Sequence, residues 1–530
     1  MARLARVEDR PTPPEVYSWR VYVNALIATF AAIMIGYDSA FIGTSISLTS
    51  FKTEFDLLDK STTELNLISA NIVSMYQAGC FFGAIFGYPI GYFYGRKFGL
   101  MIAGAVFCVG AALQVAVSSH TGLGIMYAGR VIVGLAIGVA SNLAPIYVAE
   151  ISPPAIRGRL VGMYELCWQI GGVIGFWINY GVTEHIGPSH KQWIIAFAIQ
   201  LVPGGLLLIG TPLMTESPRF LVTRDRNGQA LRNLSYLRNL PHDAPYIVQD
   251  LAGAGFFGPI RTVMADMKLI QRLLLGISLF AWQNATGINA INYYSPTIFK
   301  SIGITGSSTS LLTTGVYGLI KLVCAMIWLL YLVDQWGRRI LLMIGSAGGA
   351  VCMYYIGAYI AVADPESSST HTVDAGGKSA VAFFYLWTIF YSPSWNGTPW
   401  VVGAEIFPQH VRTFTQACMA AGNWLFAFLI ARFTPQMFTS MGYGVYLFFA
   451  SLMVISIFFV FFLLPETKQV PLERMDELFA PDVKAWNAHA IVTGRMKDHY
   501  QDAEQGKVIR DRSPELKSEE EQVERVEFSN

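Results

Sequence analysis

The sequence predicts an all-α polytopic membrane protein whose twelve transmembrane helices form two repeats of six. Three observations support this fold class. Charged residues make up 14% of the 530-residue chain, compared with about 25% in an ordinary soluble domain. Long apolar runs recur along the chain, and its mean hydropathy is +0.42. Short motifs of the first half of the chain also recur, in the same order, in the second half.

The composition argues against several other classes of protein. Hydrophobic residues reach 53% of the chain, which excludes a disordered protein. The 37 basic residues are balanced by 36 acidic ones, so no strong basic field is available to bind nucleic acid. The 6 cysteines lie in or near apolar stretches without a CxxC pair. This pattern favours small buried side chains over a secreted disulfide scaffold.

Twelve apolar windows are each long enough to cross a bilayer, since about 20 helical residues span about 30 Å of hydrocarbon. The windows are continuous rather than alternating, which excludes a porin-like barrel. Each must be helical because lipid cannot satisfy backbone polar groups. The first window is too long for the apolar core of a cleavable signal. The predicted spans are residues 21–47, 68–94, 99–118, 122–147, 160–182, 193–213, 272–297, 310–333, 340–362, 379–403, 414–434 and 443–464.

The loops predict the orientation of the helices, because cytoplasmic loops carry an excess of Lys and Arg. Basic residues gather on one side, which we expect to be cytoplasmic, and an even number of spans then places both termini there. The basic residues of this side are Arg96, Lys97, Arg157, Arg159, Arg219, Arg224, Arg226, Arg232, Arg238, Arg261, Lys268, Arg338, Arg339 and Arg412. The other side carries only Lys52, Lys60, Lys191, Lys300 and Lys378.

A polar segment divides the chain into two bundles. We expect a cytoplasmic N-terminal tail at 1–20, a first six-helix bundle at 21–213, a cytoplasmic interdomain segment at 214–271, a second six-helix bundle at 272–464 and a cytoplasmic C-terminal tail at 465–530. The last tail ends in KSEEEQVERVEFSN, which is too polar to build a core. The lysines of the cytoplasmic tails are either targets of the ubiquitin machinery or part of a plain solvated tail.

Three motifs recur between the halves. The pattern ExxPxxxR runs from Glu150 to Arg157 and again from Glu405 to Arg412. A Gly-Arg-basic triplet at 95–97 returns at 337–339, and the glutamate of TESPR at 216 returns in PETK at 466. Two parallel repeats are typical of transporters in which one bundle rocks against the other around a site near the bilayer midplane.

The chain resembles the sugar porter branch of the major facilitator superfamily over residues 20–475. The motifs that carry the resemblance are GYD at 36–38, GRVIVG at 129–134, YVAEISPPAIRGRL at 147–160, ESPRFL at 216–221, GINAINYYSP at 287–296, DQWGRR at 334–339, PWVVGAEIFP at 399–408 and PETK at 465–468. The resemblance implies the major facilitator fold and secondary transport by alternating access.

Within that branch the chain is most similar to the fungal quinate permeases. The stretches that carry this similarity are EDRPTP at 8–13, GYDSAFIGT at 36–44, YELCWQIGGVIGFWINYGV at 164–182 and YSPSWNGTPW at 391–400. One departure concerns the GxxxD(R)xGR(R) loop of the family, in which Tyr92 stands at the position of the acid. The second copy keeps Asp334, so we expect the two halves to close with unequal stability.

Charges at bilayer depth are costly and point to function. The resemblance implies that Asp38 of GYD binds the coupling proton and that Arg130 of GRV is its partner. A rocking motion that separates the pair would favour protonation of Asp38. A permanent structural salt bridge is the alternative. Every histidine lies outside the predicted spans, so carboxylates are expected to carry any protons.

The repeated acids and arginines fall at the cytoplasmic ends of the predicted helices. We expect them to form ion pairs between the two bundles that hold the outward-open state and break when it opens inward. Local helix capping is the alternative. These gating candidates are Glu150, Arg157, Glu216, Asp334, Arg338, Glu405, Arg412 and Glu466.

Amides and aromatic rings suit the recognition of a polyol, because amides both donate and accept hydrogen bonds. Glu165 stands where the family typically has a glutamine, and Lys321 lies in the middle of a predicted span. Lys321 is either a structural counter-charge or an attractor of an anionic substrate. The substrate-binding candidates are Glu165, Gln283, Asn284, Asn289, Lys321, Trp400 and Asn423, with Trp168, Gln169, Trp282, Tyr293, Trp395 and Asn396 as secondary candidates. Bonding between helices is the alternative role of the amides.

These observations favour a plasma-membrane importer of quinate that is driven by proton symport. A hexose or pentose transporter, as a symporter or a facilitator, is the alternative, and a sensor that no longer transports is a third possibility. The sequence shows no metal-ligand cluster, no nucleophile and base pattern and no phosphate loop. We therefore expect no catalytic residue, metal or cofactor, and we expect the partners to be a small-molecule substrate, protons and the lipid bilayer, with no nucleic acid.

Overall fold

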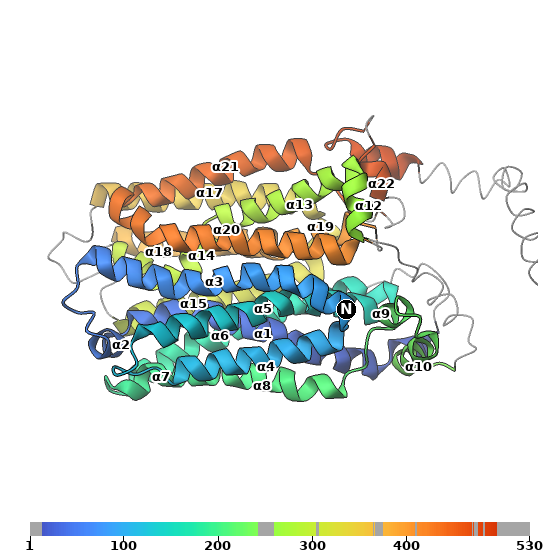
Figure 1. Cartoon of the computed structure of the whole chain (residues 1–530). Coiled ribbons are helices and arrows are strands. Elements are labelled where there is room, and N and C mark those ends of the chain that lie inside the picture. The colour runs from blue at the N-terminus through green and yellow to red at the C-terminus, as the bar shows by residue number, and fades with distance from the viewer. Residues whose placement is uncertain are drawn as a thin grey trace, which may run out of the picture.

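The computed structural model describes residues 13–241, 259–303, 307–363, 365, 375–408, 411–468, 470, 475–480 and 483–495. The described residues form helices and no strand. The remaining parts of the two predicted tails and of the predicted segment 214–271 lie outside the described residues, as does the side chain of Asp334. The long helices run side by side in one elongated bundle (Figure 1).

The first half of the chain contributes the helices in the lower part of Figure 1. They are α1 (Trp19–Ser47), α2 (Thr49–Glu54), α3 (Thr62–Phe93), α4 (Arg96–Val115), α5 (Leu123–Ile151), α6 (Pro154–His185), α7 (His190–Ile199) and α8 (Leu201–Gly210). Local sequence sets their ends. Ser61 and Glu64 form a capping box at the start of α3, which satisfies backbone donors that a helix start leaves unpaired.

Short helices follow at one end of the bundle. They are α9 (Pro218–Val222), α10 (Asn227–Arg238) and α12 (Pro259–Ala265). We call this end of the molecule the α10 end, and the opposite end, which carries α2 and the start of α7, the α2 end (Figure 1).

The second half contributes the helices in the upper part of Figure 1 and also α15, which lies lower, at the level of α5. They are α13 (Met267–Ala285), α14 (Ile288–Ser301), α15 (Ser307–Ile327), α16 (Val333–Gln335), α17 (Arg338–Ala363), α18 (Ala375–Tyr391), α19 (Thr398–Glu405), α20 (Arg412–Met441), α21 (Gly444–Leu463) and α22 (Met475–Leu478). Two π-helical segments, η3 (Trp328–Leu332) and η4 (Ser392–Asn396), interrupt this series.

Among the described residues, nine helical stretches are long and apolar enough to cross a membrane. The other three predicted spans fall on α6, on α13 with α14, and on α18 with η4 and α19. The last two are broken helices, and all three carry amide or charged side chains that face the interior. Non-helical backbone at membrane depth is tolerated where protein or a cavity surrounds it, so the apolar signal is weakest where a site can form.

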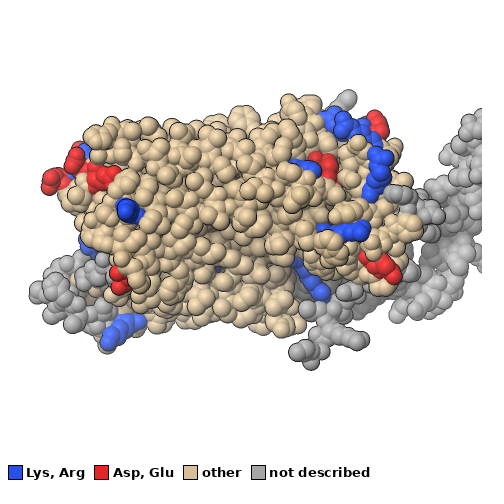
Figure 2. Space-filling model, turned by 90° about the horizontal axis from the view of Figure 1, so that it is seen from below, with Lys and Arg blue, Asp and Glu red and all other residues tan. Residues whose placement is uncertain are grey.

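The outer surface fits a lipid environment. On the face shown in Figure 2, acidic and basic residues gather toward the two ends of the molecule. Large apolar side chains are exposed between them, including Phe82, Val109, Val351 and Phe458, each more than half exposed. Such a surface suits hydrocarbon rather than water.

The two halves meet along three pairs of helices. The helix α1 packs against α14, α3 against α20 and α6 against α15. One apolar cluster is centred on α1, α3, α4 and α5 and includes Trp424 and three alanines of α20, and another is centred on α13, α14, α17, α18 and α21 and includes Ala40 and Phe176 of the first half. Apolar packing therefore crosses the boundary between the halves along these helix faces.

Candidate functional site

One cavity between the two halves brings together all seven primary substrate-site candidates. It has a volume of about 50 Å³. Glu165 enters it from α6 of the first half, and the second half supplies the other six side chains. These are Gln283 and Asn284 of α13, Asn289 of α14, Lys321 of α15, Trp400 of α19 and Asn423 of α20. We call this space the central cavity.

A break in one helix places the amides in this cavity. Gly287 has a φ of +86° between α13 and α14, a conformation that glycine adopts without strain. The turn lets the amide of Asn289 donate to Oδ1 of Asn284. In turn, Nδ2 of Asn284 donates to Oδ1 of Asn423 at 2.9 Å. A chain of three amides therefore joins α14, α13 and α20.

Glu165 links the two halves. Its Oε1 atom accepts hydrogen bonds from Nε2 of Gln169 at 2.5 Å and from Nδ2 of Asn396 at 2.8 Å. Asn396 belongs to η4 of the second half, where its carbonyl oxygen also accepts from Nε2 of Gln283 at 2.8 Å. The carboxyl of Glu165 is thus held by amides of both bundles at the centre of the molecule.

Aromatic rings form part of the cavity wall. Trp168 of α6 and Trp424 of α20 lie parallel across the halves, with ring centroids 6.3 Å apart. The ring of Trp400 meets Phe280 edge to face at 4.6 Å. Flat apolar rings beside hydrogen-bonding amides suit a ligand with both C–H faces and hydroxyl groups.

The secondary candidates divide into two groups. Trp168, Tyr293 and Asn396 line the central cavity, and Gln169 lines a smaller neighbouring space. Trp282 instead packs against Phe459, and Nε1 of Trp395 donates to Ser346, away from the cavity. The structure adds polar and aromatic lining residues that sequence reasoning missed, namely Ser39, Asn292, Tyr391 and Trp424. Of these, only Asn292 had a sequence signal, because it lies three residues after Asn289 on the same helical face.

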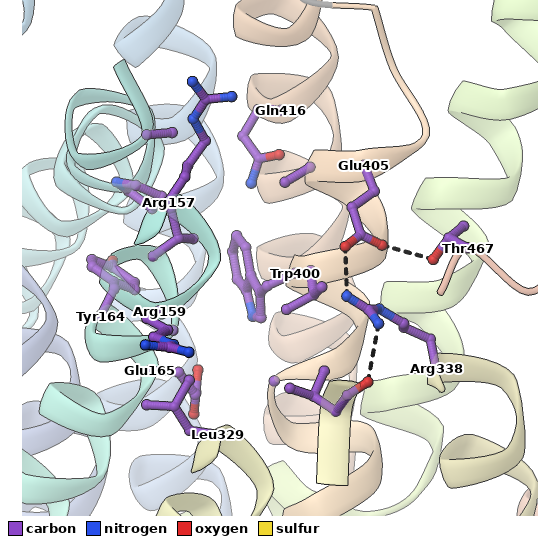
Figure 3. Close-up of a pocket in the computed structure, with 18 of the residues that line it drawn as sticks. Arg157, Arg159, Tyr164, Glu165, Leu329, Arg338, Trp400, Glu405, Gln416 and Thr467 are labelled. Atoms are coloured by element: carbon purple, nitrogen blue, oxygen red, sulfur yellow. Dashed lines mark hydrogen bonds and ion pairs between the residues drawn. The ribbon is translucent and has the colours of Figure 1, made fainter. Parts of the chain in front are cut away.

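A second cavity, of about 350 Å³, opens from the centre toward the α10 end. It shares Glu165 and Trp400 with the central cavity. Figure 3 shows Arg157, Arg159 and Glu165 on one side of it and Trp400, Glu405 and Gln416 on the other. Both arginines of the repeated motif, Arg157 and Arg412, line it.

The α2 end is closed by direct contact between the halves. A Cβ atom placed on Gly43 of α1 would lie only 1.9 Å from the backbone oxygen of Tyr293 of α14, so the two backbones touch there. Nearby, Nδ2 of Asn66 on α3 donates to Oγ1 of Thr439 on α20 at 2.7 Å. The structure is therefore closed at the α2 end and open at the α10 end.

Asp38 and Arg130 form a fully buried ion pair between α1 and α5. The guanidinium of Arg130 also donates through Nε to the carbonyl of Ile72 at 3.0 Å and lies 4.6 Å from the ring of Tyr76. The second carboxyl oxygen of Asp38, Oδ2, has no hydrogen-bond partner. The next residue, Ser39, lines the central cavity, so the pair lies directly behind the cavity wall.

The repeated motif acids bind the same backbone positions in both halves. Arg96 pairs with Glu150 at 2.8 Å, and Arg338 pairs with Glu405 at 2.8 Å. Glu216 accepts the backbone N–H of Arg96 at 3.0 Å, just as Glu466 accepts that of Arg338 at 2.9 Å.

All of these pairs lie within one half. The predicted ion pairs between the two bundles belong to the outward-open state, so they remain a prediction. Gly95 and Gly337, which precede the two arginines, both have φ near +90°, at +97° and +87°. Burial raises the pKa of Glu216, and hydrogen bonds from the backbone N–H groups of Ser217, Lys97 and Arg96 act in the opposite direction.

Tyr92, at the position of the missing acid, has its own partner. The guanidinium of Arg224 lies 5.0 Å from its ring, and Nη2 of Arg224 donates to its carbonyl oxygen at 2.7 Å. A cation over an aromatic ring is attracted by the ring quadrupole. The first half thus binds an arginine at this position through a ring and a carbonyl.

Removing either motif arginine is expected to destabilise the protein. The side chains of Arg96 and Glu150 are only 9% and 12% exposed, so Arg96→Ala leaves a nearly buried carboxylate without its cation. We expect a loss of about 1.5–3 kcal/mol, seen as a lower melting temperature of the detergent-solubilised protein. Arg338→Ala should have a similar effect, whereas the exposed Lys60→Ala should have none. Unchanged melting of both arginine variants would contradict this account.

Comparison with known proteins supports one family. Residues 24–479 match the family model "Sugar (and other) transporter". A "Quinate permease" of Emericella nidulans is 56% identical over 94% of this chain and 96% of its own length. A "Probable quinate permease" of Aspergillus fumigatus is 54% identical over 99% of both chains. The solved structure of the proton:xylose symporter XylE has a TM-score of 0.74 at 24% identity and covers 87% of this chain and 100% of its own.

Proposed function

Because this chain belongs to the sugar transporter family of the major facilitator superfamily, we propose that it imports quinate through the plasma membrane by proton symport. Quinate is a six-membered ring with hydroxyl groups and one carboxylate. The observation that carries the proposal is the central cavity, where amides and aromatic rings from both halves meet a buried lysine. Relatives that are 54–56% identical bear the name quinate permease, which supports the choice of substrate.

The α10 end is the cytoplasmic side in this proposal. It carries most of the loop arginines, in agreement with the excess of basic residues in cytoplasmic loops. The structure then represents the inward-facing state, because the larger cavity opens at that end while Gly43 and Tyr293 touch at the other. Rocking of the two halves about the central cavity would exchange these openings.

Asp38 supplies the coupling proton site in this proposal. Its ion pair with Arg130 is fully buried, and Oδ2 lacks a partner, so any motion that pulls Arg130 away leaves a carboxylate that a proton stabilises. Asp38 and Arg130 lie on different helices of one half. A shift of α1 against α5 during rocking is therefore sufficient to couple protonation to the opening of the α2 end.

Uptake of labelled quinate tests the proposal. The chain is expressed in transporter-deficient yeast, and uptake is measured at about pH 5 and about pH 7.5, both above the ordinary pKa of Asp, with and without a protonophore and excess glucose. We expect uptake that is faster at the lower pH, lost with the protonophore and unaffected by glucose. Empty-vector cells correct for entry of protonated quinate. Entry of glucose or xylose without quinate would instead establish a sugar transporter.

A further inference from the structure

Two opposite charges lie buried in the central cavity and come from opposite halves. Glu165 lies on α6 and Lys321 on α15, and each is 7% exposed. Both line the central cavity. Buried charges normally occur as close pairs, because an isolated charge loses its hydration without compensation. Glu165 and Lys321 attract each other across the cavity, but among the described residues no hydrogen bond or ion pair joins them, since Glu165 accepts from Gln169 and Asn396 instead.

The ammonium of Lys321 makes no hydrogen bond or ion pair with the described residues. The hydrogen bond between Lys321 and Ser392 involves the backbone oxygen of Lys321, which accepts from Oγ of Ser392 at 2.8 Å. The side chain also lines the smaller space of about 20 Å³ beside Ser39 and Asn292. A buried ammonium that faces a cavity without an anionic contact is suited to receive an anion from a ligand.

Glu165 is held by amides instead of by Lys321. Its Oε1 accepts both amide hydrogen bonds, and Oε2 accepts none from the described residues. Glu165 also lines the larger cavity that opens at the α10 end, so a proton can reach it from solution.

Few other ionisable groups can compensate the charge of Glu165. Asp38 and Arg130, on the neighbouring α1 and α5, neutralise each other. The remaining ionisable groups on α6 are Arg157, Arg159, Tyr164, Cys167, Tyr180, Glu184 and His185. Those on the elements packed against α6 are Arg20, Tyr22 and Tyr37 of α1, Tyr127, Tyr147 and Glu150 of α5, His190 and Lys191 of α7, Tyr317, Lys321 and Cys324 of α15, and Tyr331 of η3, with Tyr391 of α18 on the cavity wall. Within this group, Lys321 is the charged residue that shares the central cavity with Glu165.

Charge balance then connects the pair to the substrate. One carboxylate and one ammonium leave the empty cavity neutral. A substrate carboxylate changes the sum to minus one, which is unfavourable at membrane depth. A proton from the external solution that binds a carboxylate oxygen of Glu165 restores neutrality, and it leaves on the other side with the substrate. A neutral polyol needs no such proton.

We propose that Lys321 binds the carboxylate of the substrate and that Glu165 takes up one proton for each carboxylate carried, so that this pair selects anionic over neutral ring polyols. This inference rests on the proposed transport of quinate. It adds a second proton to the one assigned to Asp38, and it makes the number of charges moved per quinate depend on Glu165.

The number of charges moved per quinate tests the proposal. The full-length protein is reconstituted in liposomes, and the dependence of labelled quinate flux on an imposed membrane potential, from which the net charge moved per quinate follows, is measured for fixed proton and quinate gradients. Glu165→Gln resembles the protonated side chain, so we expect this variant to move one positive charge fewer per quinate than the wild type. The matched control Glu64→Gln, in the exposed capping box of α3, should move the same charge as the wild type. The difference between variants does not depend on whether Asp38 also carries a proton.

Binding provides a second measurement that does not require turnover. Lys321→Gln should weaken quinate binding about tenfold or more while binding of the neutral amide of quinate stays unchanged. Lys300→Gln, an exposed lysine on α14, should change neither affinity. Equal charge movement in Glu165→Gln and the wild type, or equal weakening of both ligands by Lys321→Gln, would overturn the inference and leave quinate transport intact. No quinate transport by the wild type would overturn the proposed function, and with it this inference.

Discussion

Asp38→Asn is expected to remove one of the two protons that drive quinate uptake, so that uphill uptake falls sharply while downhill exchange of quinate persists. Asparagine keeps the size of the side chain but cannot be ionised, so the buried site no longer gains and loses a proton during each cycle. Cells that carry this variant should accumulate quinate to a much lower ratio of internal to external concentration than wild-type cells. Counterflow of labelled quinate, which needs the rocking motion but no proton gradient, should remain measurable.

The control addresses the folding of this variant. Arg130 is fully buried beside Asp38, and loss of one partner of a buried ion pair costs about 3–5 kcal/mol. The double variant Asp38→Asn, Arg130→Gln removes both charges and should recover stability, as judged by melting temperature, without recovering uphill uptake to the wild-type level. Uphill accumulation by Asp38→Asn at the wild-type level would rule out Asp38 as the essential proton site.

Gly43→Val is expected to lower quinate transport about 10- to 100-fold without preventing binding from outside. The structure leaves no space for a side chain at this position, since even a Cβ atom would lie 1.9 Å from the backbone oxygen of Tyr293. The contact joins α1 and α14, one from each half, at the closed α2 end of this structure, and in the proposed rocking cycle we expect it to separate when that end opens. Valine should therefore hold that end open and block the inward-facing state.

A matched glycine separates this effect from a general loss of folding. A Cβ atom on Gly181 of α6 would meet nothing within 4 Å, so Gly181→Val should transport quinate normally. Binding of labelled quinate to right-side-out vesicles should be retained in Gly43→Val, whereas counterflow should be lost. If Gly43→Val cells transport quinate at the wild-type rate, the closed α2 end is not part of the transport cycle.

Much of the fold is predictable because a membrane helix is determined by the sequence of its own segment. An apolar window must satisfy its own backbone hydrogen bonds, so the predicted spans 21–47 and 443–464 correspond closely to α1 (Trp19–Ser47) and α21 (Gly444–Leu463). The π-helical segments η3 and η4 were not predicted. Such irregular turns depend on what packs around them, and one of them carries Asn396, which reaches Glu165 in the other half.

The candidate site was predictable only in part. The repeated motifs led to Arg96, Arg338 and their glutamate partners, and local spacing placed them at helix ends. Pattern alone could not decide whether these charges join the two halves or bind within one half. In this state they bind within one half. Arg96 and Arg338 each begin a helix, and the first backbone N–H group of that helix donates to a glutamate of the same bundle, Glu216 or Glu466.

The sequence by itself determined that this chain is helical, embedded in a membrane, duplicated and related to the sugar porters. These properties follow from composition, apolar run length and motifs, each of which acts over a few tens of residues. The tertiary structure alone decided which end is open, that Lys321 and Glu165 share one cavity, and how Glu165 meets Asn396, 231 residues away. Those features depend on how the two bundles pack against each other, and side chains far apart in sequence acquire a common environment only through that packing.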